Sequence, residues 1–204
     1  MSALAALILF TGAVRSVVAQ GAIAIKENEP PASVTIIMVD GRAENKGCAG
    51  GFVWTGRFIV SVRSTTGDRE TDLNALLRAE TLTFPEHSYW HVWPIHFDDY
   101  NHDGHPDFNL TPFTCGNNGF YTLFTISPDG GISRLPVIPD APLILFGGDP
   151  SSDAIKVTPE GIKVGAYDNS VGAGFTSTYR WDKERGAFVL VKPVPSAPTP
   201  TPIP

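Results

Sequence analysis

Short apolar runs separated by glycine, proline and other turn residues recur along the chain, which has 20 glycines and 18 prolines among its 204 residues. The β-branched run "SVTIIMVDG" at 33–41 predicts a strand that ends at Asp-Gly. Pairs of apolar runs around turn residues predict hairpins at 50–62, where the turn would lie at 55–57, and at 119–137 and 176–194. This pattern is typical of an all-β protein, and we expect antiparallel hairpins that form a sandwich or a small propeller-like domain.

One segment has helical periodicity. Residues 71–80, "TDLNALLRAE", place three leucines on one face of a helix, and Thr71 or Asp72 is positioned to cap its first turn. We therefore expect a single short helix beside the strands.

The two ends of the chain differ from its middle. Residues 1–24 begin with an apolar run that is too short to cross a bilayer and end in small residues, which predicts a secretory signal peptide. Because no Lys or Arg precedes that run and Arg15 follows it, a buried strand is the alternative. Residues 193–204 are rich in proline, which lacks the N–H that a sheet needs, and predict an extended tail or linker. The single β domain is expected at 25–192.

Charge and cysteine content narrow the possible functions. The formal net charge is −6 and the basic residues are scattered, so a nucleic-acid-binding surface is not indicated. Cys48 and Cys115 are the only cysteines. In an exported protein, periplasmic or extracellular, the oxidising compartment allows one disulfide between them, and two separate buried thiols are the alternative. No membrane span is expected in the mature chain.

An acidic loop is the clearest chemical motif. Residues 96–108 read "HFDDYNHDGHPDF", and from Asp99 onward the spacing is D-x-N-x-D-G-x-x-D. Calcium prefers about six to eight oxygen ligands, which alternate side chains in a tight turn supply. Carboxylates so close together repel each other unless a cation lies between them. The sequence therefore predicts a structural calcium site with ligands from Asp99, Asn101, Asp103, the carbonyl of His105, and Asp107.

Two alternatives to a calcium site remain open. The twelfth position of the loop is Leu110, where an EF-hand has a bidentate Glu, so the motif also fits a polar Asx turn on the surface. A transition-metal site is the other alternative, because histidines surround the loop. They are His87, His91, His96, His102 and His105.

The acidic loop and the segments after it resemble a known group of proteins. The stretch "FDDYNHDGHPDFNLTPFTCGNNGFYTLFTISPDGGISRL" at 97–135 and the hairpin "STYRWDKERGAFVLVK" at 177–192 carry the resemblance. They resemble bacterial exported β-proteins related to the calcium-binding immunity proteins that inhibit lysozyme-like effectors of type IV secretion systems, and more distantly periplasmic lysozyme inhibitors. The calcium loop alone is also similar to FG-GAP and VCBS repeats of adhesins, although only one such loop occurs here.

The resemblance implies a protein partner, with a lysozyme-like glycosidase as the first candidate. In the inhibitor families a protruding loop enters the cleft of the enzyme. The matching segment here is "AYDNSVGAGFTSTY" at 166–179, which implies partner-binding roles for Tyr167, Ser170, Gly172, Gly174 and Phe175. A glycine-rich hairpin loop without such a role is the alternative.

The sequence contains no established catalytic motif, so we expect a non-enzymatic protein. A carbohydrate-binding or adhesive module is the alternative, since exposed aromatic rings stack on sugars. The candidate aromatic residues are Trp54, Tyr89, Trp90 and Trp93, and these side chains would otherwise fill the core. A secreted hydrolase is the third possibility, because catalytic carboxylates can be brought together by folding.

Overall fold

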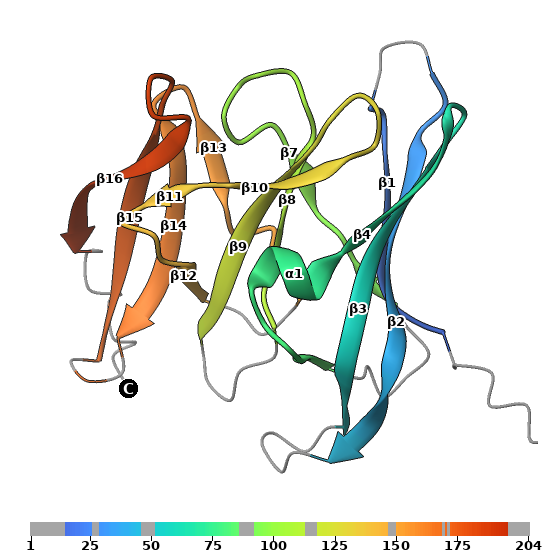
Figure 1. The fold of residues 1–204 in the computed structure, drawn as a ribbon. Coiled ribbons are helices and arrows are strands. Elements are labelled where there is room, and N and C mark those ends of the chain that lie inside the picture. Colours follow the sequence, from blue (N-terminus) through green and yellow to red (C-terminus); the bar gives the residue numbers. More distant parts are fainter. Residues whose placement is uncertain are drawn as a thin grey trace, which may run out of the picture.

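A computed structural model of the chain describes residues 15–25, 29–45, 52–85, 92–112, 118–146, 150–168, 170 and 172–195. The described residues are almost entirely strands, joined by turns and one short helix (Figure 1). The expected all-β class is confirmed.

The strands form three sheets, which we name by their order along the chain. The N-terminal sheet contains β1 (Ser16–Ile23), β2 (Ala32–Asn45), β3 (Phe52–Ser64), β4 (Gly67–Asp72), β5 (Leu82–Pro85) and β6 (Trp93–Pro94). The central sheet contains β7 (Phe97–Asp98), β8 (Asp107–Leu110), β9 (Asn118–Ile126), β10 (Ile132–Leu135) and β12 (Leu143–Phe146). The C-terminal sheet contains β11 (Val137–Ile138), β13 (Lys156–Thr158), β14 (Gly161–Asp168), β15 (Ala173–Asp182) and β16 (Ala187–Pro195).

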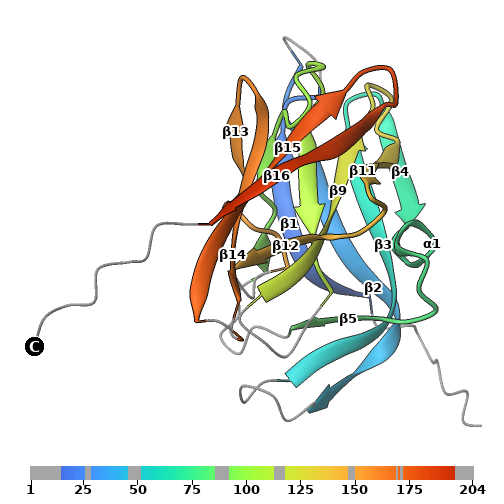
Figure 2. The ribbon, with the colours of Figure 1, turned by 90° about the vertical axis from the view of Figure 1, so that its left-hand side faces the viewer.

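The three sheets lie in layers, with the central sheet between the other two (Figures 1 and 2). Consecutive strands pair antiparallel in most places, whereas β1 with β6 and β11 with β16 pair parallel. Of the two arrangements that the sequence allowed, the structure therefore corresponds to the sandwich. The acidic loop joins β7 to β8, as expected for a loop between strands.

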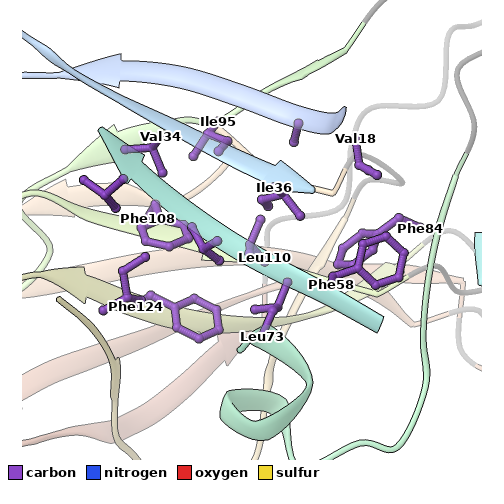
Figure 3. Close-up of a cluster of buried hydrophobic side chains, with 14 of the residues drawn as sticks. Val18, Val34, Ile36, Phe58, Leu73, Phe84, Ile95, Phe108, Leu110 and Phe124 are labelled. Atoms are coloured by element: carbon purple, nitrogen blue, oxygen red, sulfur yellow. The ribbon is translucent and has the colours of Figure 1, made fainter. Parts of the chain in front are cut away.

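The first hydrophobic core fills the space between the N-terminal and central sheets (Figure 3). Phe58 and Phe84 of the N-terminal sheet meet edge to face, with ring centroids 4.9 Å apart. Phe108 and Phe124 of the central sheet stack at 5.2 Å. Each ring pair lies within one sheet, but all four rings are buried in the core that the two sheets share. Burial of these rings removes a large apolar area from water and holds the two layers together.

The second hydrophobic core lies on the other face of the central sheet. Tyr121 and Leu123 of β9 pack there with side chains of the C-terminal sheet, which include Ile162, Val164 and Phe188. A strand buried on both faces needs apolar residues at consecutive positions, because its side chains alternate between the faces. Residues 121–126 of β9 meet this requirement, since Tyr121, Leu123, Phe124 and Ile126 are all buried.

The helix is confirmed at a shorter length than predicted. α1 (Leu73–Leu77) begins after Asp72, whose carboxylate accepts a hydrogen bond from the N–H of Ala75 at 3.0 Å. It ends at Arg78, which adopts the left-handed conformation. No helix in the described part of the chain is long and apolar enough to cross a membrane.

The hairpin predicted at 50–62 is wrong, because β3 continues through 55–57 as one strand. A Cβ at Gly56 would lie 2.0 Å from the carbonyl oxygen of Asp40, and Gly56 pairs with Gly41 of β2. The glycine therefore permits close approach of two backbones beside a register shift, and it does not form a turn. The other two predicted hairpins are present as β9–β10 and β15–β16.

Both ends of the β structure differ from the expected boundaries. The predicted signal peptide, 1–24, overlaps β1, in which Val18 and Ala19 are buried, so the β structure begins before residue 25. Residues 16–23 thus follow the alternative of a buried strand, and 1–14 lie outside the described residues. At the other end, β16 extends to Pro195, which pairs with Phe175. Proline is tolerated there because β11 pairs with only Phe188 and Val189 of β16, leaving its end at a sheet edge.

Loss of β1 is expected to destabilise the fold. A chain that begins at residue 25 lacks the buried side chains of Val18 and Ala19 and the pairing with β2. Compared with a chain that begins at Arg15, we expect its free energy of unfolding to fall by a few kcal/mol, on the order expected for burial of aliphatic side chains. Urea unfolding of the two chains measures the difference, and equal midpoints would show that β1 contributes nothing to the fold.

Candidate functional sites

The acidic loop closes over one end of the central sheet (Figure 1). Its ends are held together because Asp98 of β7 pairs with Asp107 of β8. Two residues within it have a positive φ, namely His102 at 58° and Gly104 at 85°. Nothing lies within 4 Å of a Cβ built at Gly104, so a side chain would fit there. Glycine is favoured at this position because it adopts a positive φ without strain.

The side chains of the loop bind its own backbone. The carboxylate of Asp99 accepts hydrogen bonds from the N–H groups of Asp103, at 3.0 Å, and Gly104, at 2.9 Å. The N–H of His105 donates to Asp103 Oδ1 at 2.8 Å. An ionised carboxylate has about four acceptor positions, so these bonds leave capacity for a cation.

Asn101 is buried at the centre of the loop. Its Nδ2 donates to Asp103 Oδ2 at 2.9 Å, and its Oδ1 accepts the N–H of Asp103 at 3.1 Å. The structure therefore brings Asp99, Asn101 and Asp103 into one hydrogen-bonded turn, which is the arrangement of an Asx turn and also the starting geometry of an oxygen-rich cation loop.

Asp107 occupies the least ordinary environment in the loop. The residue is fully buried, and its Oδ2 accepts the N–H of Tyr100 at 2.8 Å. Its Oδ1 has no hydrogen-bond partner, and neither has the buried Oγ1 of Thr125, which lies opposite it on β9. A buried polar oxygen without a partner costs about 1–3 kcal/mol, and more when it is charged.

The pKa of Asp107 is raised to about 7, chiefly by burial, and the negative charges of Asp103 and Asp99 contribute to the rise. The N–H of Tyr100 acts in the opposite direction. The Thr125 hydroxyl also opposes the shift, but it does not reach hydrogen-bonding geometry. Asp107 is thus a carboxylate that needs either a proton or a nearby cation.

A buried network fixes the base of the loop. The hydroxyl of Tyr100 accepts a hydrogen bond from Asn109 Nδ2 at 2.8 Å, and burial raises the pKa of this hydroxyl. Asn109 also exchanges two hydrogen bonds with the backbone of Ser152, each of 2.8 Å. The loop is therefore anchored to β8 and to the segment that precedes β13.

The histidines do not form a metal cluster in the described part of the chain. His102 is exposed, and its Nε2 lies 3.0 Å from the carbonyl oxygen of Thr158, which links the loop to the C-terminal sheet. The backbone N–H of His96 donates to Ser151 Oγ. His87 and His91 lie outside the described residues.

The donor set of the loop fits calcium better than a transition metal, since it offers carboxylate and amide oxygens. Among the described side chains, however, no three His, Cys, Asp or Glu meet in a geometry that could hold a metal ion. Calcium binding would therefore require Asp99 and Asp103 to turn from the backbone toward the ion. Asp107 Oδ1 has no hydrogen-bond partner, so this atom is available to a cation without any rearrangement of hydrogen bonds.

The hairpin between β14 and β15 carries the residues implied by the resemblance. Tyr167 pairs with Gly174, and Phe175 pairs with Ala166, so the side chains of Tyr167 and Phe175 lie on opposite faces of the hairpin. At its turn, both the N–H and the hydroxyl of Ser170 donate to Asp168 Oδ1, at 2.8 and 2.6 Å. The left-handed conformation of Gly172, with φ 66°, continues the turn.

The central sheet positions this hairpin. Asn118 of β9 accepts the N–H of Tyr167 through Oδ1 at 3.2 Å and donates to the carbonyl of Tyr167 through Nδ2 at 2.7 Å. A cavity of about 610 Å³ lies beside the hairpin and is lined by Lys156, Lys163, Tyr167 and Phe175 among others. Of the five implied residues, Tyr167 and Phe175 line this cavity, whereas Ser170, Gly172 and Gly174 do not, and Tyr167 is 36% exposed.

The remaining candidates divide into packed residues and residues that the structure does not describe. Trp54 and Trp93 pack against the first hydrophobic core, and Trp93 Nε1 donates to the carbonyl of Pro85 at 3.2 Å. Both side chains are partly buried and contribute to packing. Tyr89, Trp90 and both cysteines, Cys48 and Cys115, lie outside the described residues, so the disulfide stays a prediction.

Comparison of the chain with protein-family models, curated proteins and solved structures gave no match.

Sequence reasoning missed the residues that approach the loop from elsewhere in the chain. Thr125 lies next to Asp107 only through the register of β8 and β9, and Ser152 reaches Asn109 from a segment 43 residues away. No local motif marks either residue. The partner of a buried strand carboxylate can be found from the sequence only once the strand register is known.

Protonation of Asp107 is expected to stabilise the calcium-free protein. Its folded-state pKa of about 7 lies above the ordinary value of 3.8, so the folded state binds this proton more tightly than the unfolded chain does. In EDTA, the free energy of unfolding should therefore rise as the pH falls through about 7, and level off near about pH 4. We expect a gain of at most about 4 kcal/mol, because the shift is about three pKa units and each unit corresponds to about 1.4 kcal/mol.

Urea unfolding at several pH values, compared with Asp107→Asn, isolates this contribution from that of the other titrating groups. The variant should lack the rise. An identical pH dependence in both proteins would exclude a raised pKa for Asp107.

Proposed function

We propose that this chain is a non-enzymatic β-protein whose acidic loop binds a structural calcium ion. The unpartnered Oδ1 of the buried Asp107 carries the proposal, because a cation would neutralise a charge that is otherwise buried alone. The side chains of Asp99, Asn101 and Asp103, together with the carbonyl of His105, would complete an oxygen-only ligand set.

A structural role follows from the way the loop is built. The proposed ligands all come from residues 99–107, and holding the ion would occupy their oxygens, which favours a structural role over a catalytic one. Calcium would bind the folded loop far better than the unfolded chain, so the binding free energy would appear as stability. The base of the loop already rests on Tyr100 and Asn109, which limits the ordering that an ion would have to impose.

Calcium is expected to raise the thermal midpoint of the protein at neutral pH. At a calcium concentration of about 100 times Kd, the gain should approach 2.7 kcal/mol. Magnesium should give a smaller rise, since its small octahedral shell suits this loop poorly. Asp107→Asn and Asp103→Ala should abolish the calcium effect, whereas Asp68→Asn, which removes a carboxylate that is 64% exposed on β4, should keep it.

Thermal melts in calcium, magnesium and EDTA provide the measurement, and isothermal titration provides the stoichiometry. Equal thermal midpoints of the wild-type protein in calcium and in EDTA would contradict the metal site, and the loop would then be an Asx turn without a bound ion. Equal destabilisation by Asp103→Ala in both conditions would have the same consequence.

We also propose that the hairpin between β14 and β15 binds a protein partner, for which the resemblance implies a lysozyme-like glycosidase. The distribution of ion pairs supports an interaction surface there. Each described arginine outside the C-terminal sheet lies within 4 Å of a carboxylate. By contrast, no ion pair is found within the described part of the chain for four cations of that sheet, which are Lys156, Lys163, Arg180 and Lys183.

The register strengthens this argument. Lys156 and Lys163 lie directly opposite each other on β13 and β14, and like charges in such positions destabilise a sheet. Both line the cavity beside Tyr167 and Phe175. A partner that presents carboxylates to this surface would relieve the repulsion.

A charge reversal is expected to weaken partner binding. The double variant Lys156→Glu/Lys163→Glu should lower affinity for the partner by at least about tenfold, mainly through a slower association rate. Tyr167→Ala should also weaken binding, whereas Arg42→Glu, on the exposed surface of β2, is the matched control. Binding and inhibition assays against a panel of lysozyme-type glycosidases measure both effects. Failure to bind any member removes the inhibitor proposal and leaves the calcium proposal intact.

A further inference from the structure

The N-terminal sheet covers only part of the central sheet. On the face toward that sheet, Phe124 and Ile126 of β9 belong to the first hydrophobic core. Side chains two and four positions earlier, Thr122 and Phe120, lie on the same face because side chains alternate along a strand. Phe120 is 47% exposed, and Ile144, which pairs with it on β12, is 39% exposed. An apolar surface is therefore left open at this end of the sheet.

A groove of about 380 Å³ forms where α1 and β5 flank this open surface. Leu77 of α1 and Leu82 of β5 supply one wall, and Phe120 supplies part of the other. The position of α1 beside β9 is visible in Figure 1. This volume lies within the range of about 300–1,000 Å³ that is usual for small-molecule sites.

Arg134 of β10 is the one cation among the described residues that line the groove. It pairs in register with Phe124, and its buried Nε has no hydrogen-bond partner. Its Nη2 lies 3.5 Å from Asp140 Oδ1, which is longer than a good charged hydrogen bond, and Asp140 is 69% exposed. The same carboxylate lies 3.5 Å from Arg78. The guanidinium group of Arg134 is thus incompletely satisfied in an apolar setting.

We propose that this groove binds an amphiphilic monocarboxylate, with its hydrocarbon part along Leu77, Leu82 and Phe120 and its carboxylate at Arg134. Arginine matches a carboxylate through paired N–H donors, and the apolar walls favour a hydrocarbon chain. A peptide is a poorer fit, because its buried amide groups would need partners and Thr122 and Asp140 are the other polar side chains of the lining.

Asp140 competes with such a ligand for Arg134. The Asp140 carboxylate is 69% exposed and lies 3.5 Å from the guanidinium group, so displacing it has only a small cost. Removing its charge should therefore tighten binding, whereas a purely hydrophobic groove would not respond. The site is independent of the acidic loop, because Asp107 and Thr125 lie on the opposite face of the central sheet from Phe124.

Isothermal titration of the full chain with decanoate, below its micellar concentration and without added calcium, tests the proposal. We expect saturable binding of one decanoate, at least about tenfold weaker with Arg134→Gln and stronger with Asp140→Asn. Decanol, which lacks the charge, should bind at least about tenfold more weakly than decanoate to the wild-type protein. Phe120→Ala should weaken decanoate and decanol alike, because it alters only the hydrocarbon wall.

Thermal melts of each variant separate loss of the site from loss of the fold, and Arg134→Lys should restore part of the affinity if charge is the cause. Equal affinity for decanoate and decanol, or no change with either Arg134→Gln or Asp140→Asn, would overturn the proposal. Absence of decanoate binding to a protein that melts cooperatively would overturn it as well. Tighter binding of a peptide with an apolar C-terminal residue than of decanoate would replace the proposed ligand with a peptide carboxylate.

Discussion

The central sheet must bury both of its faces, and the other features of the molecule depend on this constraint. Leu123 and Phe124 are consecutive residues, yet they belong to two different hydrophobic cores. Only a layer with a neighbour on each side can satisfy such a sequence. The N-terminal sheet supplies one neighbour and the C-terminal sheet the other, and each shares a separate core with the central sheet.

Burial of both faces of the central sheet also explains why the carboxylate of Asp107 is buried. On β8, Phe108 and Leu110 face the first core, so Asp107 and Asn109 must face the other side, which the C-terminal sheet and its preceding segment cover. The side chain of Asn109 is hydrogen-bonded there to Tyr100 and to the backbone of Ser152. Asp107 accepts only the N–H of Tyr100, because the hydroxyl of Thr125 is not in hydrogen-bonding geometry. A carboxylate placed in this way is costly unless a proton or a cation accompanies it. The acidic loop that adjoins it has the ligands that a cation would use.

Local signals in the sequence predicted the parts of the fold that depend on local chemistry. Asp72 caps α1 because its carboxylate can reach an N–H three residues later, and the hairpin turns of β9–β10 and β15–β16 follow their turn residues. The hairpin at 50–62 was predicted wrongly because of Gly56. A glycine that allows a neighbouring backbone to approach cannot be distinguished, from the sequence alone, from a glycine that forms a turn. β1 was ambiguous for a related reason: a short apolar segment near a chain start suits both a signal peptide and a buried strand. Thr125 could not be predicted to lie beside Asp107, since only strand register brings them together.

The acidic loop lies beside cations of the C-terminal sheet, so the charge of the loop affects the electrostatic potential at both. Asn101 and His102 of the loop line a cavity of about 490 Å³ together with Arg180 and Lys183 of the C-terminal sheet. Without a cation, the carboxylates of the loop would partly offset the positive charges of Arg180 and Lys183, to which Glu160 of the same cavity also lies close. A divalent ion in the loop would remove this offset, so the surface would attract an anionic partner more strongly. Linkage is reciprocal, and an anionic partner bound there would in turn favour the ion. The two proposed sites would then support each other through electrostatics, without any change of fold.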